Sequence, residues 1–237
     1  MFIPAWNEEE ILPSVLAELD AGLPDADVLV VDDGSTDRTA ALAEEHGARV
    51  LSFGENRGLR AGIAAGYGYA DEHGYAFAGR VDADGQHPVD ELVRLLAIVR
   101  AGEADVAVGS RFVSGDGYEP YRYAPSPSRR FGTAVLRRGM KAALGGPFHD
   151  ATSGMYAVNA RAMPILAVPY ESGAPEVESL LRLQKGGLSV VEVPVDMRER
   201  ASGESKLRGK RAVQLVLTVA GTLVVYGLVR RVRGSSR

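Results

Sequence analysis

The sequence contains no cysteine, which excludes disulfide bonds and zinc sites built on thiolates. Histidine is scarce as well: the four histidines occur singly, without the spacing of metal ligands, so a histidine-built zinc site is not expected. Residues 1–6 are too short for a cleavable signal peptide and lack its basic segment. They have the character of the end of a β-strand, and this abrupt beginning is compatible with a natural start site slightly further upstream.

Composition and charge place the chain among ordinary globular proteins. Its 237 residues are 46% apolar and 24% charged, enough for one large α/β domain or two small ones. Eight of the 27 basic residues, and no acidic residue, lie within residues 206–237, which leaves 19 basic against 31 acidic residues elsewhere. An acidic body is a poor partner for nucleic acid, whereas a basic tail suits an anionic membrane surface.

Short β-branched runs alternate with stretches of helical periodicity. Repeated β-α-β units of this length predict an α/β fold with a mainly parallel, Rossmann-like sheet and helices on both faces. The spacing of Asn7 and Glu10 predicts a capping box at the start of the first helix. Strands are expected at residues 2–5, 27–32, 49–53, 75–81, 105–108, 155–158 and 188–195, and further helices at residues 36–46, 59–72, 88–100, 129–144 and 175–185.

Polar motifs directly follow three of the expected strands, at Asp32-Asp33-Gly34-Ser35, Asp82-Ala83-Asp84 and Gly109-Ser110-Arg111. Ligands of parallel α/β sheets bind beyond the carboxyl ends of the strands, so these motifs are expected to meet in one crevice. A stretch rich in Gly, Pro and Tyr at residues 114–128 is expected to form a loop over that crevice.

Asp82 and Asp84 are separated by one residue, so a turn can present both carboxylates to one hard divalent cation. Mg²⁺ and Mn²⁺ prefer such oxygen ligands, and water and substrate phosphates commonly complete their coordination. Gln86 could add a carbonyl oxygen or orient a bound water. The simpler alternative is a solvated turn that caps the next helix.

The acidic strand end at Asp32 and Asp33 can accept hydrogen bonds from a nucleobase or a ribose hydroxyl. A helix N-cap formed by Asp33 or Ser35 is the alternative, and both roles can coexist. The sequence thus offers a nucleotide contact and a metal site at two strand ends.

Six short motifs follow one another along the chain: Pro4-Ala5-Trp6-Asn7-Glu8, Val31-Asp32-Asp33-Gly34-Ser35, Asp82-Ala83-Asp84-Gly85-Gln86-His87-Pro88, Gly109-Ser110-Arg111, Asp150-Ala151-Thr152-Ser153-Gly154 and Arg200-Ala201-Ser202-Gly203-Glu204-Ser205-Lys206. The series resembles the family-2 glycosyltransferases, most closely their dolichyl- and polyprenyl-phosphate mannosyltransferase branch. The resemblance covers residues 2–207 and implies a GT-A fold. Each motif is weak by itself, whereas six in this order are specific.

The resemblance also implies roles for individual residues. Residues acting in transfer would be Asp84, Arg111, Arg200 and Lys206. The nucleotide sugar would lie against Pro4, Trp6, Glu8, Val31, Asp33, Asp82, Ala83, Asp84, Arg111, Arg200 and Lys206. A divalent metal would be held by Asp82, Asp84 and Gln86, and the acceptor phosphate by Arg129 and Thr133.

The chain departs from the family pattern at several of these positions. Trp6 stands where Tyr is usual, Thr133 where Ser is usual, and Pro175-Glu176 where Phe-Gln is commoner. The change at Trp6 alters the wall of the base pocket. Both GDP-mannose and a UDP-hexose therefore remain candidate donors.

The nature of the acceptor decides whether a general base is needed. A hydroxyl must lose a proton, for which Glu176 and Asp150 are the candidates, although either could be a structural hydrogen-bond acceptor. A lipid monophosphate is already anionic and needs cations, which the arginines would supply. We therefore expect an inverting, metal-dependent transfer of a hexose, mannose above all, to a polyprenyl or dolichyl phosphate. Transfer to a hydroxyl of a glycan or small molecule is the alternative, and a catalytically silent nucleotide-sugar-binding or membrane-scaffold protein is a third interpretation.

The tail suggests how the protein meets a membrane. Residues 212–229 are uncharged and lie between two basic clusters. As a helix they would be about 27 Å long, marginal against a hydrocarbon core of roughly 30 Å. We expect a catalytic domain at residues 1–206 and a helix at residues 207–237 that associates with the cytoplasmic face of a membrane, spanning it or lying on it. A stripe of small and polar residues would also allow a homo-oligomer. A peripheral helix of a soluble domain is the alternative.

Overall fold

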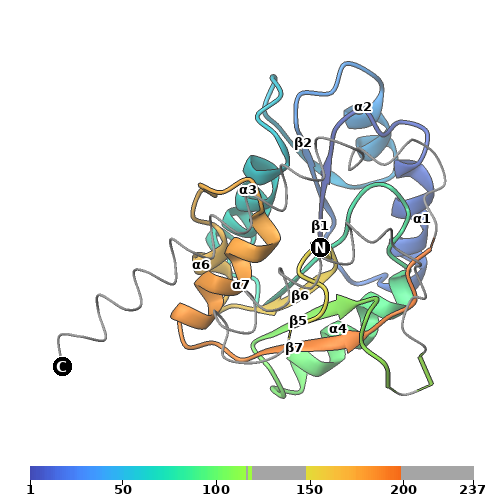
Figure 1. The fold of residues 1–237 in the computed structure, drawn as a ribbon. Coiled ribbons are helices and arrows are strands. Elements are labelled where there is room, and N and C mark those ends of the chain that lie inside the picture. The colour runs from blue at the N-terminus through green and yellow to red at the C-terminus, as the bar shows by residue number, and fades with distance from the viewer. Residues whose placement is uncertain (116, 119–147, 199–237) are drawn as a thin grey trace, which may run out of the picture.

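The computed structural model describes residues 1–115, 117–118 and 148–198 of the chain (Figure 1). Within them, one sheet has the strand order β3-β2-β1-β4-β6-β5-β7. The strands are β1 (Phe2–Ala5), β2 (Leu29–Asp32), β3 (Arg49–Ser52), β4 (Phe77–Arg80), β5 (Val106–Ser110), β6 (Tyr156–Asn159) and β7 (Val190–Pro194). The helices are α1 (Leu12–Gly22), α2 (Thr39–Glu45), α3 (Leu59–Glu72), α4 (Val89–Arg100), α6 (Met163–Leu166) and α7 (Pro175–Lys185).

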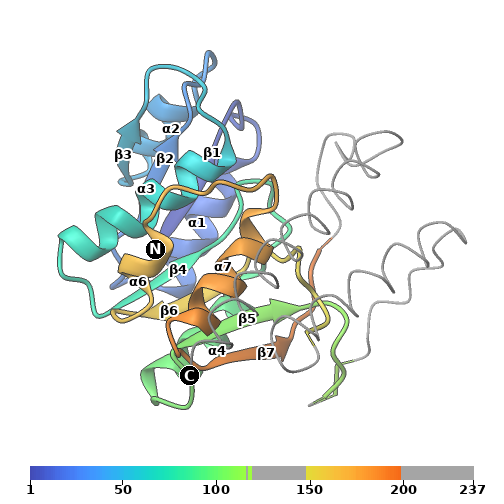
Figure 2. The same ribbon diagram turned by 60° about the vertical axis from the view of Figure 1, so that its left-hand side comes forward.

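The sheet is mainly parallel, as the sequence predicts. Only β6 runs antiparallel to its neighbours β4 and β5, whereas the other paired strands are parallel. In Figure 2, β5 and β7 lie side by side, in agreement with their parallel register. Because β6 runs antiparallel, its amino end lies beside the carboxyl ends of β4 and β5. The motif that precedes β6 therefore lies at those carboxyl ends.

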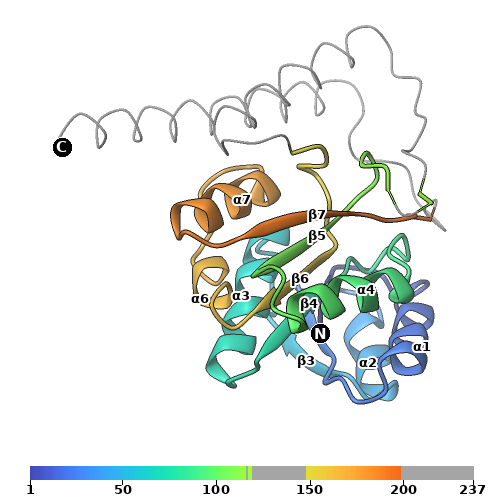
Figure 3. The same ribbon diagram turned by 90° about the horizontal axis from the view of Figure 1, so that it is seen from below.

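Two apolar layers sandwich the sheet because successive side chains of a strand point to opposite faces. Phe2 and Val31 pack with apolar residues of α3, α6 and α7. Ile3 and Val30 pack on the other face with residues of α1 and α4. Figure 3 shows α3, α6 and α7 on one side of the sheet and α1 and α2 on the other. Continuous apolar strands are therefore buried on both faces, as expected for a doubly covered sheet.

Close contact between α3 and β1 requires a glycine. A Cβ atom added at Gly66 would overlap the ring of Phe2, whereas one added at Gly68, two residues on, would lie 3.8 Å from the Cβ of Ala167. The two positions share one helix, so they differ in packing and not in backbone preference. The approach of α3 to β1 is thus fixed by the missing side chain of Gly66.

Gly66→Ala is therefore expected to lower the free energy of unfolding by about 1–3 kcal/mol, since the helix or the Phe2 ring must move. Gly68→Ala is the matched control and is expected to raise it by about 0.5–1 kcal/mol, because alanine restricts the unfolded chain and fits the available space. Urea unfolding of both variants measures the difference. Equal effects of the two substitutions would contradict this account of the α3–β1 contact.

The predicted helix caps near the first two strands are wrong. α1 begins at Leu12 rather than at Asn7, and it has no side-chain cap. Asn7 instead adopts φ = 54°, a left-handed conformation that asparagine tolerates, and its Oδ1 accepts the Thr36 amide at 2.8 Å. α2 also lacks a side-chain cap, so neither Asp33 nor Ser35 has that role. These polar groups join the loops after β1 and β2 to each other.

The register of the strands brings the polar motifs together. Ala5, Asp32 and Ser52 are successive partners across β1, β2 and β3, so these three strands end in line. Phe2 pairs with Arg80, and the chain after Arg80 therefore continues beside the remainder of β1. The turn with the paired carboxylates consequently emerges toward the end of β1.

Several predictions concern residues that the structure does not describe. These are the helix at residues 129–144, most of the loop at residues 114–128, and the tail from residue 199 onward. Among the described residues, no helix has the length and apolar character needed to cross a bilayer. The division into domains at residue 206 therefore stays a prediction.

Candidate active site

The turn after β4 presents two carboxylates and buries the residue between them. Asp82 and Asp84 are partly exposed, whereas the side chain of Ala83 is buried in the core beside α1 and α4. The Gln86 amide donates to Asp84 Oδ1 at 3.1 Å, and Gly85 takes φ = 72°, which closes the turn. The turn therefore leaves both carboxylates partly exposed, and their action as a metal-binding pair stays a prediction.

Asp82 is held from three sides. Its Oδ1 accepts Arg80 Nη2 at 3.1 Å, and its backbone amide donates to His87 Nδ1 at 3.0 Å. Gly154, just before β6, leaves no room for a Cβ atom between its backbone and the Asp82 carboxylate. Burial lowers the pKa of His87, and because Nδ1 accepts a hydrogen bond, the neutral ring carries its proton on Nε2. The orientation of Asp82 is thus set before any ligand binds.

Arg80, at the end of β4, is almost completely buried, with 2% of its surface exposed. Its Nη2 also contacts Glu176 Oε1 at 3.2 Å, at the first turn of α7. Burial lowers the pKa of Arg80, but Asp82 and Glu176 outweigh this effect and raise it above its ordinary value. Burial raises the pKa of Glu176, and Arg80 opposes the shift. One guanidinium therefore bridges Asp82 and Glu176.

The acidic end of β2 organises the neighbouring loops. Asp33 is buried, and its carboxylate accepts the amides of Arg57 and Gly58, with the shortest distance 2.6 Å to Arg57. Asp32 Oδ2 accepts Ser52 Oγ at 2.7 Å. Both acids thus have a structural function, and a contact from Asp33 to a nucleotide stays a prediction.

The residues predicted to line the nucleotide pocket differ in exposure. Val31 has no exposed surface and Pro4 is buried against α3, so neither side chain forms an open wall, and only their backbone could face a nucleotide. Trp6 is 43% exposed just beyond β1, and Glu8 is partly exposed with its amide bound to Thr39. An exposed indole at a strand end can stack on a planar base.

Arg111, directly after β5, makes a two-pronged ion pair with Asp150. Nε lies 2.8 Å from Oδ2 and Nη2 lies 2.9 Å from Oδ1, and Nη2 also donates to Thr152 Oγ1. The Asp150 side chain has no exposed surface, whereas that of Arg111 is 29% exposed. Asp150 therefore serves as a structural acceptor that orients a partly exposed arginine at the strand end.

The segment after β7 returns to the carboxylate turn. The Arg198 amide donates to the Gln86 carbonyl at 2.9 Å, and Gln86 Nε2 donates to the Arg198 carbonyl at 3.2 Å. Arg200 and Lys206 follow this point and lie outside the described residues, as do Arg129 and Thr133. The chain that leads to Arg200 thus departs from the turn that holds Asp84.

Comparison with known proteins decides the family. Residues 1–163 match the family described as Glycosyl transferase family 2. The chain belongs to this family. The glycosyltransferase is 34% identical over 247 residues to a polyprenol monophosphomannose synthase of Mycolicibacterium smegmatis, covering 100% of this chain and 91% of the relative. It is also 34% identical over 240 residues to an undecaprenyl-phosphate mannosyltransferase of Micrococcus luteus, covering 98% and 95%.

Solved structures confirm the expected GT-A fold of this glycosyltransferase. A glucosyl-3-phosphoglycerate synthase of Mycobacterium tuberculosis, in complex with Mn²⁺, uridine-diphosphate and phosphoglyceric acid, matches with a TM-score of 0.68. The match covers 95% of this chain and 77% of that one at 21% identity. At this identity the likeness concerns the fold alone.

The carboxylate turn suits a hard divalent cation. Among the described residues, no group of three or more His, Cys, Asp or Glu side chains gathers around a metal position. The residues of the glycosyltransferase predicted to hold a cation, Asp82, Asp84 and Gln86, share one turn, where the Gln86 amide donates to Asp84 Oδ1. Such a site suits Mg²⁺ or Mn²⁺, which accept water and substrate phosphate oxygens as the remaining ligands.

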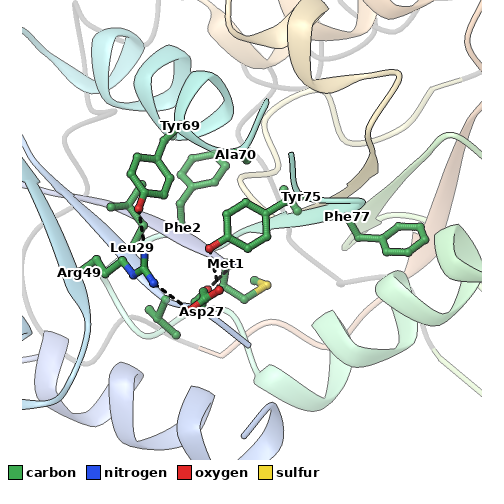
Figure 4. Close-up of a pocket in the computed structure, with 12 residues that line it drawn as sticks. Met1, Phe2, Asp27, Leu29, Arg49, Tyr69, Ala70, Tyr75 and Phe77 are labelled. Atoms are coloured by element: carbon green, nitrogen blue, oxygen red, sulfur yellow. Dashed lines mark hydrogen bonds and ion pairs between the residues drawn. The ribbon is translucent and has the colours of Figure 1, made fainter. Parts of the chain in front are cut away.

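A pocket at the opposite end of the sheet is a poor candidate for the active site (Figure 4). It lies at the amino ends of β1 and β2, and its polar side chains bind one another. Tyr75 Oη donates to Asp27 at 2.6 Å, and Arg49 donates to Tyr69 Oη at 3.1 Å. The polar groups of this pocket in the glycosyltransferase are thus engaged with one another, whereas Asp82 and Asp84 lie after the carboxyl end of β4.

Three residues that shape the Asp82 site are not indicated by the sequence pattern. Arg80 lies inside an expected strand, His87 is one of four single histidines, and Gly154 is one letter of a motif. A charged residue at the end of an otherwise apolar buried strand is the signal that could have identified Arg80, because buried arginine needs partners.

Proposed function

We propose that this glycosyltransferase moves mannose from a nucleotide diphosphate sugar to a polyprenyl phosphate, with inversion at the anomeric carbon. Two relatives named for transfer to polyprenol or undecaprenyl phosphate align with at least 98% of the chain. The donor is GDP-mannose in this proposal, and a UDP-hexose is the alternative. These names support the reaction, and the side chains at the site support the choice of acceptor.

The observation that carries the acceptor proposal is the state of both candidate bases. Glu176 contacts the buried guanidinium of Arg80, and Asp150 is bound in two places by Arg111. Both oxygens of Asp150 are bound, and one oxygen of Glu176 is paired with Arg80, which opposes the rise in the Glu176 pKa that burial causes. Transfer to a sugar hydroxyl needs a carboxylate that is free to take the proton. A phosphate acceptor is already anionic and needs no base, so the geometry favours it.

Each candidate residue has a role in this reaction. Asp82 and Asp84 would hold a divalent cation, which would neutralise the charge that develops on the leaving diphosphate. Trp6 and Glu8 bound the nucleotide, and Asp33 fixes the loop beside it. Further contacts to donor phosphates come from Arg111, Arg200 and Lys206, and contacts to the acceptor phosphate from Arg129 and Thr133.

A donor-by-acceptor assay tests the proposal. GDP-mannose and UDP-hexoses are each offered with polyprenyl phosphate, or with soluble glycosides and phosphoglycerate, in Mn²⁺ and in Mg²⁺. We expect a lipid-linked mannose product from GDP-mannose, and none when the metal is removed with EDTA. Turnover restricted to soluble acceptors would replace the lipid proposal with the hydroxyl alternative.

Membrane association belongs to the same proposal, because a polyprenyl acceptor resides in a bilayer. The basic and apolar segment at residues 207–237 would bring the catalytic domain to the cytoplasmic face, with pairing of tails as a route to oligomers. Lysine and arginine near anionic lipid contribute about 1 kcal/mol each. Arg208, Lys210 and Arg211 precede the uncharged stretch and are the residues to test.

Changing Arg208, Lys210 and Arg211 to Glu is therefore expected to weaken binding to vesicles with anionic lipid by about a hundredfold or more. The matched control for the change in total charge is the joint change to Glu of three residues that are exposed in the described part of the chain, Arg38, Arg100 and Lys185. Sedimentation with vesicles of anionic and of neutral lipid measures the effect. Equal binding by the triple variant and the wild type would remove electrostatic docking from the proposal.

A further inference from the structure

Arg80 violates the usual rule for buried charge in a way that points to the site. Its guanidinium is 2% exposed, and its Nε has no hydrogen-bond partner among the described residues. An unsatisfied buried donor lowers stability, and such exceptions in a folded protein concentrate at functional sites. The partners that Arg80 does have are two carboxylates at the carboxyl end of the sheet.

Both contacts of Arg80 use one nitrogen. Nη2 lies 3.1 Å from Asp82 Oδ1 and 3.2 Å from Glu176 Oε1, so it bridges a residue of the turn and a residue of α7. The Asp82 side chain is 33% exposed, that of Glu176 16% and that of Arg80 2%, so solvent reaches the three in that order. The charge of Arg80 therefore acts on Asp82 through poorly screened space.

The bridge also fixes the direction of the Asp82 carboxylate. Oδ1 is held by Arg80, and the other oxygen lies against the backbone of Gly154, where a Cβ atom would not fit. A carboxylate held on two sides is pre-organised for a ligand. The cost is a positive charge beside a cation site, which lowers cation affinity unless another group offsets it.

We propose that Arg80 and Glu176 are positioning residues for the metal site: Arg80 orients Asp82, and Glu176 offsets the charge of Arg80 so that the site keeps its affinity for a divalent cation. The inference rests on the proposed metal role of Asp82 and Asp84. In this role the charge of Glu176 supports binding of the cation and the donor, and Glu176 does not transfer a proton.

Glu176→Gln tests the charge balance, because it keeps the shape of the side chain and removes its charge. Mn²⁺ binding is measured by electron paramagnetic resonance of the full-length protein with saturating nucleoside diphosphate. The variant is expected to bind Mn²⁺ about tenfold more weakly than the wild type. Glu178→Gln is the control, since Glu178 also lies on α7 but is buried and pairs with Arg182. It is expected to lower the melting temperature and leave Mn²⁺ affinity unchanged.

A second substitution separates charge balance from general damage. Adding Arg80→Gln to Glu176→Gln removes the uncompensated positive charge and leaves a side-chain amide that can still donate to Asp82, so Mn²⁺ binding is expected to recover at least about threefold relative to Glu176→Gln. If each substitution only damaged the structure, the two losses of Mn²⁺ affinity would add, and the double variant would bind Mn²⁺ more weakly than Glu176→Gln. That result would overturn the proposal. If Glu176→Gln does not fold, Glu176→Asp replaces it: the shortened but charged side chain must keep Mn²⁺ affinity within about threefold, and a tenfold loss overturns the proposal.

Failure of this inference differs from failure of the metal site itself. If Asp84→Asn binds Mn²⁺ as the wild type does, the carboxylate pair does not hold the cation, and both proposals fall. If Asp84→Asn loses Mn²⁺ and Glu176→Gln retains wild-type affinity, only the positioning role of Arg80 and Glu176 is overturned.

Discussion

Asp84→Asn is expected to reduce sugar transfer by at least about a thousandfold, the largest effect among the substitutions considered. Asn retains an Oδ1 atom that can accept the Gln86 amide, which lies 3.1 Å from that oxygen in the wild type. The substitution therefore removes the charge and preserves the turn. With one of the two carboxylates lost, the cation would be bound weakly and would neutralise the charge of the departing diphosphate poorly.

The measurement is kcat and KM for the donor over a range of Mn²⁺ concentrations. Raising Mn²⁺ is expected to recover part of the activity, because the defect lies in cation binding. Asp90→Asn, in the exposed first turn of α4, is the control for loss of an acidic residue nearby and should retain wild-type turnover. Wild-type rates in Asp84→Asn at low Mn²⁺ would exclude the metal role of the turn.

The sequence predicts the fold well where local pattern and tertiary packing agree. α3 and α7 begin and end at the expected residues, because each has a clear apolar stripe and a glycine close to one of its ends. β6 lies within one residue of its expected position, yet nothing in its local pattern indicates that it runs antiparallel to β4 and β5. α6, a single turn, is too short to show helical periodicity.

The start of α1 shows why local motifs mislead. Asn7 and Glu10 match a capping box, but the end of β1 and the loop after β2 compete for the same polar groups. Asn7 binds the Thr36 amide across 29 positions of sequence, and Ser35 Oγ accepts the Asn7 amide at 3.0 Å. Contacts of this range leave no periodic signal, so the sequence alone favours the nearer partner.

The candidate site could be predicted from the sequence only in part, because some of its features follow a local pattern and others depend on contacts between distant residues. Asp82 and Asp84 follow a strand directly, and strand ends converge by a general rule of parallel sheets, so their placement follows from pattern. The partners of Glu176 and Asp150 depend on which distant arginine reaches each of them. The sequence offered both acids as candidate bases, and only the three-dimensional contacts with Arg80 and Arg111 show that each carboxylate is already engaged.

Gly154→Ala is expected to lower kcat/KM by about a hundredfold while the protein stays folded, because a small displacement of a catalytic group can cost that much. The added methyl group would overlap both oxygens and Cγ of Asp82. Gly154 does not use the left-handed backbone region, so alanine is conformationally acceptable there. The strain must therefore be relieved by movement of the Asp82 carboxylate away from Arg80 or of the segment before β6.

Mn²⁺ affinity and thermal unfolding, measured with kcat/KM, separate these two movements. Displacement of Asp82 is expected to weaken Mn²⁺ binding with a change in unfolding free energy of no more than about 2 kcal/mol, whereas displacement of the segment before β6 would lower stability further. Gly68→Ala, in an open part of α3, is the control and should leave activity intact. Full activity in Gly154→Ala would mean that the site tolerates a shifted Asp82. In that case the close approach of Gly154 serves only the packing of β6, and Asp84 dominates the hold on the cation.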